Sequence, residues 1–180
     1  STASFGHIVW SGKADGSSPI LMSFLENNST DTSIWNETTQ VGGNIAATTI
    51  CLSLSETSIS GVSNLMGLFY DSVAGAVEAW FFPEGGAWTQ ITDADFPPNL
   101  GTPEPLCRQS KPVHLNGRAY VMTTNGKIWN SDLNTLTNWT ASAFNTAQNY
   151  PDAGVGLAKY KNLIVAFGTQ STEFFQDTGL

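Results

Sequence analysis

The chain has 180 residues, of which 41% are hydrophobic and 12% charged, with 15 acidic against 7 basic residues and a net charge of −8. This composition is enough to bury one sizeable core, which excludes a disordered chain. The longest apolar runs fall far short of the ~20 residues of a membrane-spanning helix, so no insertion into a membrane is expected. The acidic balance argues against tight binding of nucleic acid, which needs clustered lysine and arginine.

The N-terminal quarter predicts strands separated by turns. Residues 5–10 have the pattern of the last strand of a preceding unit, and a loop rich in Gly, Asp and Ser follows them. Residues 20–25 predict a buried strand, and residues 33–35 predict its hairpin partner. Residues 45–54 are β-branched and apolar in partial alternation, which is typical of outer strands.

Two units with the same order of features follow, each a β-hairpin and then a tryptophan-bearing segment. Gly67 precedes Trp88 by 21 residues, Gly117 precedes Trp139 by 22 residues, and the two glycines lie 50 residues apart. A repeat of this length is typical of propeller blades or arrays, in which no unit buries its hydrophobic face alone. The repeat therefore predicts a stack of sheets.

Turn and breaker residues separate the predicted units. Four prolines lie between 97 and 105, which excludes a central strand and predicts a crossover between blades. Asn125 and Gly126 are the strongest hairpin signal, because a type I′ turn needs positive φ at both central residues. Residues 163–167 and 171–175 predict the strands of a last unit. No window has the 3.6-residue period of a helix.

The predicted fold class is all-β, with β-propeller-type blades of antiparallel sheets in one propeller region over residues 1–180. The chain starts without methionine and ends just after an apparent hairpin, so we interpret it as a piece of a larger propeller protein. The approximate limits of the predicted blades are 1–18 (a remnant), 19–63, 64–110, 111–160 and 161–180 (the start of the next blade).

Large aromatic residues recur once per unit. Such recurrence favours packing between neighbouring sheets over a sugar-binding platform, because a buried aromatic side chain contributes about 1.5–3 kcal/mol. The residues predicted to pack the blades are Trp80, Trp88, Trp129, Trp139, Phe174 and Phe175.

No residue set points to catalysis, a cofactor or a metal, and an enzyme is not expected. His7 and His114 lack any ligand spacing around them. Cys51 and Cys107 lie 56 residues apart without a C-x-x-C partner, so we expect two free thiols rather than a metal site or a disulfide framework.

Two acidic motifs allow a chemical interpretation and a structural one. Asp93 and Asp95 offer two carboxylates, as a glycosidase pair or a calcium site would. We favour an Asx-rich turn before the proline crossover. Residues 130–139 are similar to the Asp-box of sialidase-type propellers but lack its glycine, and that motif closes a blade hairpin without making a protein a hydrolase.

Residues 111–179 carry a family resemblance. Its most specific stretches are Ser131-Asp132-Leu133-Asn134 followed by Trp139, and Ser171-Thr172-Glu173-Phe174-Phe175 followed by Gly179. With these stretches the segment resembles the propeller region of tail nozzle proteins of short-tailed bacteriophages, which are related in role to packaged-DNA stabilisation and tail-hub proteins. Both stretches lie in expected blade hairpins, so they indicate a family without marking a catalytic site.

The resemblance implies a structural role in the tail of a virion. It implies a homo-oligomer, a hexameric nozzle, through which the viral DNA is retained and then ejected without specific binding. The implied partners are neighbouring copies of the chain, a tail adaptor protein above it, and tail fibres or a plug. A polar or negative channel lining would repel phosphate and let the duplex slide. The acids proposed for that lining are Asp71, Glu78, Glu84, Asp93 and Asp95.

The alternative is a carbohydrate-binding, lectin-like propeller of a secreted protein. The six tryptophans, the acidic pI and several Asn-x-Ser/Thr sequons favour it. Stoichiometry separates the two hypotheses, because a nozzle protein belongs to a six-fold or twelve-fold assembly and a lectin would bind glycans as a monomer or small oligomer.

Overall fold

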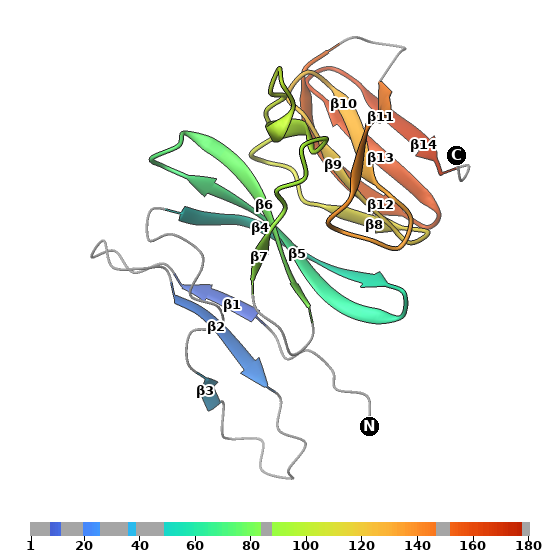
Figure 1. Ribbon diagram of the computed structural model, residues 1–180. Helices are drawn as coiled ribbons and strands as arrows, with labels where there is room; N and C mark the ends of the chain where they lie inside the picture. The colour runs from blue at the N-terminus through green and yellow to red at the C-terminus, as the bar shows by residue number, and fades with distance from the viewer. Residues whose placement is uncertain are drawn as a thin grey trace.

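The computed structural model describes residues 8–11, 20–25, 36–38, 49–83, 88–146 and 152–177, with side chains described from residue 49 onward except that of residue 63. Within these ranges the chain forms fourteen strands and one short 3₁₀ helix, and every strand pairing is antiparallel. The strands make four separate sheets, which do not close into a ring (Figure 1). The all-β prediction is confirmed.

The first sheet has three strands, in the order β1 (Ile8–Ser11), β2 (Ile20–Leu25) and β3 (Asn36–Thr38). The remainder of the predicted N-terminal segments, at 5–7, 33–35 and 45–48, lies outside the described residues.

The second sheet is a four-stranded meander. Its strands are β4 (Thr49–Ile59), β5 (Val62–Asp71), β6 (Ala76–Pro83) and β7 (Thr89–Gln90), in that order. The turn between β4 and β5 has Ser60 at φ 52° and Gly61 at φ 77°. Positive φ at both central residues defines a type I′ turn, whose twist matches that of the flanking strands.

A crossover joins the second sheet to the third. It contains the 3₁₀ helix η1 (Pro97–Asn99), as expected from prolines that supply no N–H to a ladder. The third sheet consists of β8 (Val113–Leu115), β9 (Arg118–Met122), β10 (Lys127–Ser131) and β11 (Trp139–Thr146), and their spatial order is again the order along the chain.

The hairpin turns of the third sheet differ from the prediction. Asn116 and Gly117, both at positive φ, form the type I′ turn between β8 and β9. At the predicted position only Gly126 has positive φ, 84°, and Asn125 does not. The Gly126 N–H donates to the Thr123 oxygen at 3.0 Å, so this hairpin has a three-residue loop that needs a left-handed conformation only at its glycine.

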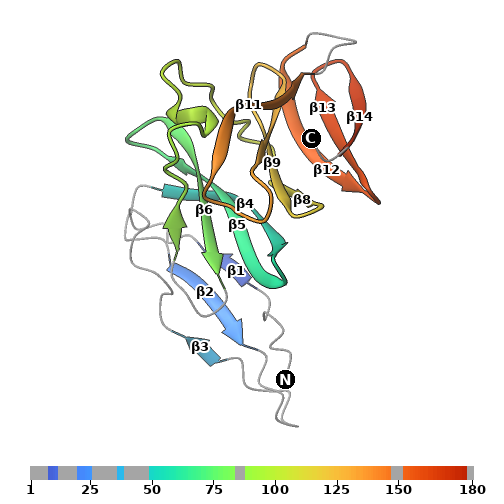
Figure 2. The same cartoon turned by 45° about the vertical axis from the view of Figure 1, so that its right-hand side comes forward.

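The fourth sheet has three strands, β12 (Gly154–Tyr160), β13 (Leu163–Gly168) and β14 (Thr172–Gln176). Figure 2 shows it beside the third sheet, on the side away from β4–β7. Its inner face meets the third sheet through a cluster that includes Leu115, Ile128, Leu157 and Ile164.

The residue boundaries of the sheets differ from those of the predicted blades, which are 19–63, 64–110, 111–160 and 161–180. Strand β4 pairs with β5 rather than closing the preceding unit, and β12 pairs with β13 rather than closing the third unit. The reason is local, since two-residue connections at 60–61 and 161–162 hold the strands on either side in one sheet.

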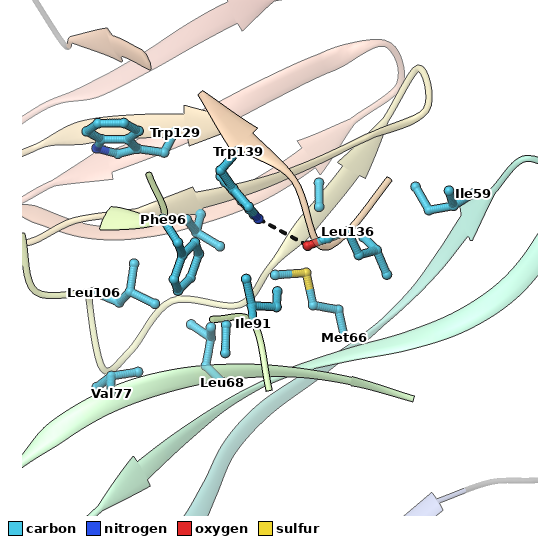
Figure 3. Packing of buried hydrophobic residues seen from close by; sticks show 13 residues of the cluster. Ile59, Met66, Leu68, Val77, Ile91, Phe96, Leu106, Trp129, Leu136 and Trp139 are labelled. Carbon is cyan, nitrogen blue, oxygen red and sulfur yellow. Dashed lines mark hydrogen bonds between the residues drawn. The ribbon is translucent and has the colours of Figure 1, made fainter. Parts of the chain in front are cut away.

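The main core lies between the second and third sheets (Figure 3). Met66 and Leu68 point from β5 toward Trp139 and Leu136 of the third sheet, and all four are at most 5% exposed. Because side chains alternate along a strand, the other face of the second sheet carries a separate cluster, which contains Phe69, Trp80 and Trp88. The second and third sheets therefore share one apolar cluster, and the third and fourth sheets share another.

Candidate functional site

The predicted packing aromatics fall into three groups. Trp129 and Trp139 belong to the core between the second and third sheets, and Trp80 and Trp88 to the opposite face of the second sheet. These four tryptophans are between 0% and 7% exposed. Phe175 is partly buried against the cluster between the third and fourth sheets.

Phe174 does not have the predicted packing role among the described residues. It is 62% exposed, because β14 alternates and Phe175 takes the inward position.

Trp139 shows how the aromatic packing is fixed. Its ring meets Phe96 of the crossover edge-on, with centroids 4.8 Å apart. Its indole N–H donates to the Leu136 oxygen at 3.0 Å, so the one polar atom of the ring is satisfied although the residue is 3% exposed. Trp139 thus contacts the crossover as well as the sheet core.

Glu104 connects the crossover to the third sheet. Its carboxylate forms a salt bridge with Lys127 and accepts a hydrogen bond of 3.1 Å from the Trp129 indole N–H. Burial alone would raise the pKa of Glu104, but hydrogen bonds from Lys127, Asn125 and Trp129 outweigh burial and lower that pKa below its usual value. The charged carboxylate is therefore the form that the fold stabilises.

The backbone extends this attachment. The Cys107 N–H donates to the Met122 oxygen at 2.9 Å, and the Thr124 N–H donates to the Pro105 oxygen at 2.8 Å. Lys127 also lies 4.4 Å from the centroid of the Phe144 ring, a cation–π distance. The crossover is consequently a part of the junction between sheets.

Asp152, just before β12, organises the β13–β14 loop of the fourth sheet. Its carboxylate accepts hydrogen bonds from the backbone N–H groups of Gln170 at 2.6 Å and Ser171 at 3.0 Å, and from the Ser171 hydroxyl at 3.1 Å. The bond from Gln170, supported by those from Ser171, lowers the pKa of Asp152. A side chain at Gly168 would collide with this carboxylate, which explains the glycine there.

The acids proposed to line a channel lie on two segments. Asp71 and Glu78 lie near the end of the β5–β6 hairpin, and Asp93 and Asp95 lie in the crossover; all four are partly exposed. Glu84 lies outside the described residues.

Three of these carboxylates also have local roles. Asp71 and Asp93 each accept a backbone N–H two residues onward at 2.8 Å, from Val73 and Asp95 respectively. Such Asx turns agree with the structural interpretation of the pair Asp93 and Asp95. Glu78 accepts a hydrogen bond of 3.0 Å from the Trp80 indole N–H.

The residues with possible reaction chemistry are kept apart. Over the described ranges no three His, Cys, Asp or Glu side chains gather as a metal site would require. Cys51 and Cys107 are free, and burial raises the pKa of each thiol to about 11. Burial, followed by the charge of Lys159, lowers the pKa of His114. His7 lies outside the described residues.

Among the described residues no helix is long and apolar enough to span a bilayer. Successive antiparallel sheets, packed face to face through apolar clusters and joined by a crossover, define a β-propeller-type protein.

Residues 3–180 match the model of a protein family described as bacteriophage P22 Gp10, β-propeller. The chain belongs to this family, and its role is that of a phage structural protein. The search of curated proteins found no match. The resemblance drawn from residues 111–179 is confirmed, and it extends over nearly the whole chain.

Proposed function

We propose that the chain forms part of the tail nozzle or hub of a short-tailed phage, as a hexameric ring around the channel that retains and then passes the viral DNA. The observation that carries the proposal is the family match over residues 3–180. In this role the chain performs no catalysis and takes no cofactor, and it contacts neighbouring copies, a tail adaptor, and fibres or a plug.

The charge of the chain supports a DNA passage rather than a DNA-binding site. Its net charge is −8, and only 7 of its 180 residues are lysine or arginine. Tight binding of a duplex needs several clustered cations that displace counterions from phosphates. A partly exposed acid such as Asp95, placed toward the duplex, would keep the DNA at a distance and let it slide.

The described tryptophans disfavour the carbohydrate-binding alternative. A sugar platform needs an exposed aromatic face, whereas Trp80, Trp88, Trp129 and Trp139 are at most 7% exposed. Trp129 and Trp139 pack between the second and third sheets, and Trp80 and Trp88 pack in the cluster on the other face of the second sheet. We therefore retain the phage channel as the proposed function.

The decisive experiment is a structure of the phage particle that contains the protein, combined with native mass spectrometry of the purified assembly. We expect six copies around the axis of the tail, with Asp95 and Glu78 facing the lumen. A monomer on the outside of the particle, or all the proposed acids on its outer surface, would contradict the proposal.

A charge variant tests the lining directly. Asp95→Lys should slow DNA ejection from assembled particles, measured as the rate at which a DNA-binding dye gains fluorescence after triggering. The matched control carries Gln109→Lys and Gln170→Lys, which make the same change in total charge at two exposed positions outside the proposed lining. Equal ejection rates in the two variants would exclude a role of this acid in the lining.

A further inference from the structure

The first strands of the second, third and fourth sheets converge. Each of β4, β8 and β12 lies at one edge of its own sheet, and β8 contacts both β4 and β12 (Figure 2). The blades of a propeller are arranged around a central channel, so the converging edges mark the side of the sheets that faces the axis. Further blades extend such a ring around the axis and leave the channel open.

A hollow of about 400 Å³ lies where these strands converge. Its walls are residues 54–56 of β4, residues 111–114 at the start of the third sheet, and residues 158–159 of β12. All three wall segments lie inside the described part of the chain, with described residues on both sides. The hollow is thus formed by neighbouring sheets of the same chain.

Two lysines and one carboxylate line this hollow. Lys111 and Lys159 are exposed, and neither forms an ion pair with another described residue. Glu56 supplies the carboxylate, so two ammonium groups face one negative charge and leave one positive charge in excess. Because the whole chain has a net charge of −8, a positive lining is unusual for it. Like charges that share a hollow repel each other unless an anion lies between them.

His114 adds a second observation at the same place. Its Nε2 atom is buried and has no hydrogen-bond partner among the described residues, although the residue lines the hollow. A buried polar atom without a partner can mark the place of a bound water or ion. Burial, followed by the charge of Lys159, lowers the pKa of His114, so the neighbouring charge already acts on this ring.

The chemistry of the lining suits a small anion. Each lysine ammonium offers three N–H donors, and the Ser55 hydroxyl offers one more. Hydrogen bonds from ammonium groups to anionic oxygens are stronger than those between neutral groups. The hollow has the size of a small-molecule pocket. Two lysines are too few for a duplex, whose tight binding takes about 6–10 phosphate contacts.

We propose that the hollow between β4, β8 and β12 binds a small oxyanion with two negative charges, of the phosphate or sulfate type. Lys111 and Lys159 hold the anion by charge-assisted hydrogen bonds, and Glu56 repels it and so weakens its binding. The inference does not depend on the proposed role in DNA passage.

The test uses the intact protein and sulfate, which remains a dianion at every pH employed. Isothermal titration calorimetry at low ionic strength should show one saturable site per chain. Lys111→Met and Lys159→Met should each weaken binding by about tenfold or more, since each removes a hydrogen bond between charged groups. Lys161→Met is the matched control, because Lys161 is exposed, carries the same charge and does not line the hollow; its affinity should stay within about twofold of wild type.

Two further measurements have a sign that a general loss of charge or of structure does not produce. Glu56→Gln should tighten sulfate binding by about twofold or more, because it removes the competing carboxylate. The affinity of the wild type should rise by up to about tenfold as the pH falls below about 6.5, since a bound dianion favours the protonated form of His114. The same titration of His114→Gln should be nearly flat.

Four results would overturn the inference. They are the absence of saturable binding, an equal loss of affinity in Lys161→Met and Lys159→Met, weaker binding by Glu56→Gln, and the same pH dependence in wild type and His114→Gln. A short DNA duplex that displaces sulfate at an equal concentration of phosphate groups would also overturn it, because the site would then belong to nucleic acid. Circular dichroism and the thermal midpoint verify that every variant folds.

Discussion

Replacing Glu104 with alanine should loosen the junction between the crossover and the third sheet. The Glu104 side chain is 16% exposed and Lys127 is 26% exposed, so the pair is partly screened by solvent. Trp129 is 1% exposed, so removal of its acceptor leaves a buried N–H unsatisfied, at a cost of about 1–3 kcal/mol. The exposed part of the ion pair adds about 0–1 kcal/mol.

The expected loss is therefore about 1–4 kcal/mol in the free energy of unfolding, or roughly 2–16 °C in Tm for a chain of this size. Glu104→Gln keeps an oxygen for the Trp129 indole and loses only the charge, so it should cost about 1 kcal/mol. Urea unfolding followed by tryptophan fluorescence gives both values, and a double-mutant cycle with Lys127→Met isolates the ion pair.

The pH dependence of the same contact has a definite sign. Since the pKa of Glu104 is lowered from 4.5 in the folded state, its contribution is complete above pH 4.5 and disappears as the pH falls through the folded value. The stability difference between wild type and Glu104→Gln should shrink accordingly in acid. If Glu104→Ala changed stability by less than about 0.5 kcal/mol, the ordinary range for surface substitutions, the attachment described above would be wrong.

Three further predictions concern other junctions and side chains. Gly168→Ala should lower the thermal midpoint, because the added Cβ displaces the Asp152 carboxylate from its hydrogen bonds to the β13–β14 loop, and combining it with Asp152→Ala should recover part of the loss; additive effects in calorimetry would contradict this. Burial lowers the pKa of His114 from 6.5, so stability should fall as the pH drops below 6.5, and His114→Gln should flatten that decline in urea unfolding between pH 7 and 5. Cys107 is buried and Cys51 partly buried, and burial raises the pKa of each thiol, so both should react slowly with a thiol reagent at pH 8 in the native state and faster once urea unfolds the chain; rapid native labelling of Cys107 would refute its burial.

The class of the fold could be predicted from sequence because its signals are local. Strand alternation and the prolines of the crossover depend on nearby residues, and the repeat of Gly67 at Gly117 is a comparison of two such local patterns. Which sheet a strand joins is harder to predict from sequence, because it depends on the geometry of the turns that connect the strands. The two-residue turn at Ser60 and Gly61 lacks the usual Asn-Gly signature, so the sequence does not show that β4 pairs with β5.

Two side chains show why the contacts between sheets could not be predicted from local sequence. Glu104 contacts Lys127 and Trp129 across 23 and 25 positions, and nothing in the local sequence marks such a pairing. The alternation of β14 is visible in the sequence, but the neighbouring sheet decides which of its faces turns inward, so the sequence does not show that Phe174 is exposed and Phe175 partly buried.

The position of Trp139 has a consequence for biosynthesis. Strand β7 ends at Gln90, so the second sheet can pair its backbone once that residue leaves the ribosome, yet the aromatic ring that helps to cover Met66 lies 49 positions later. At ~5–20 residues per second, translation leaves that apolar surface uncovered for roughly 2–10 s. During this interval the apolar face of the second sheet is exposed in the nascent chain. Chaperone binding to that face should be strongest then, before Trp139 covers it.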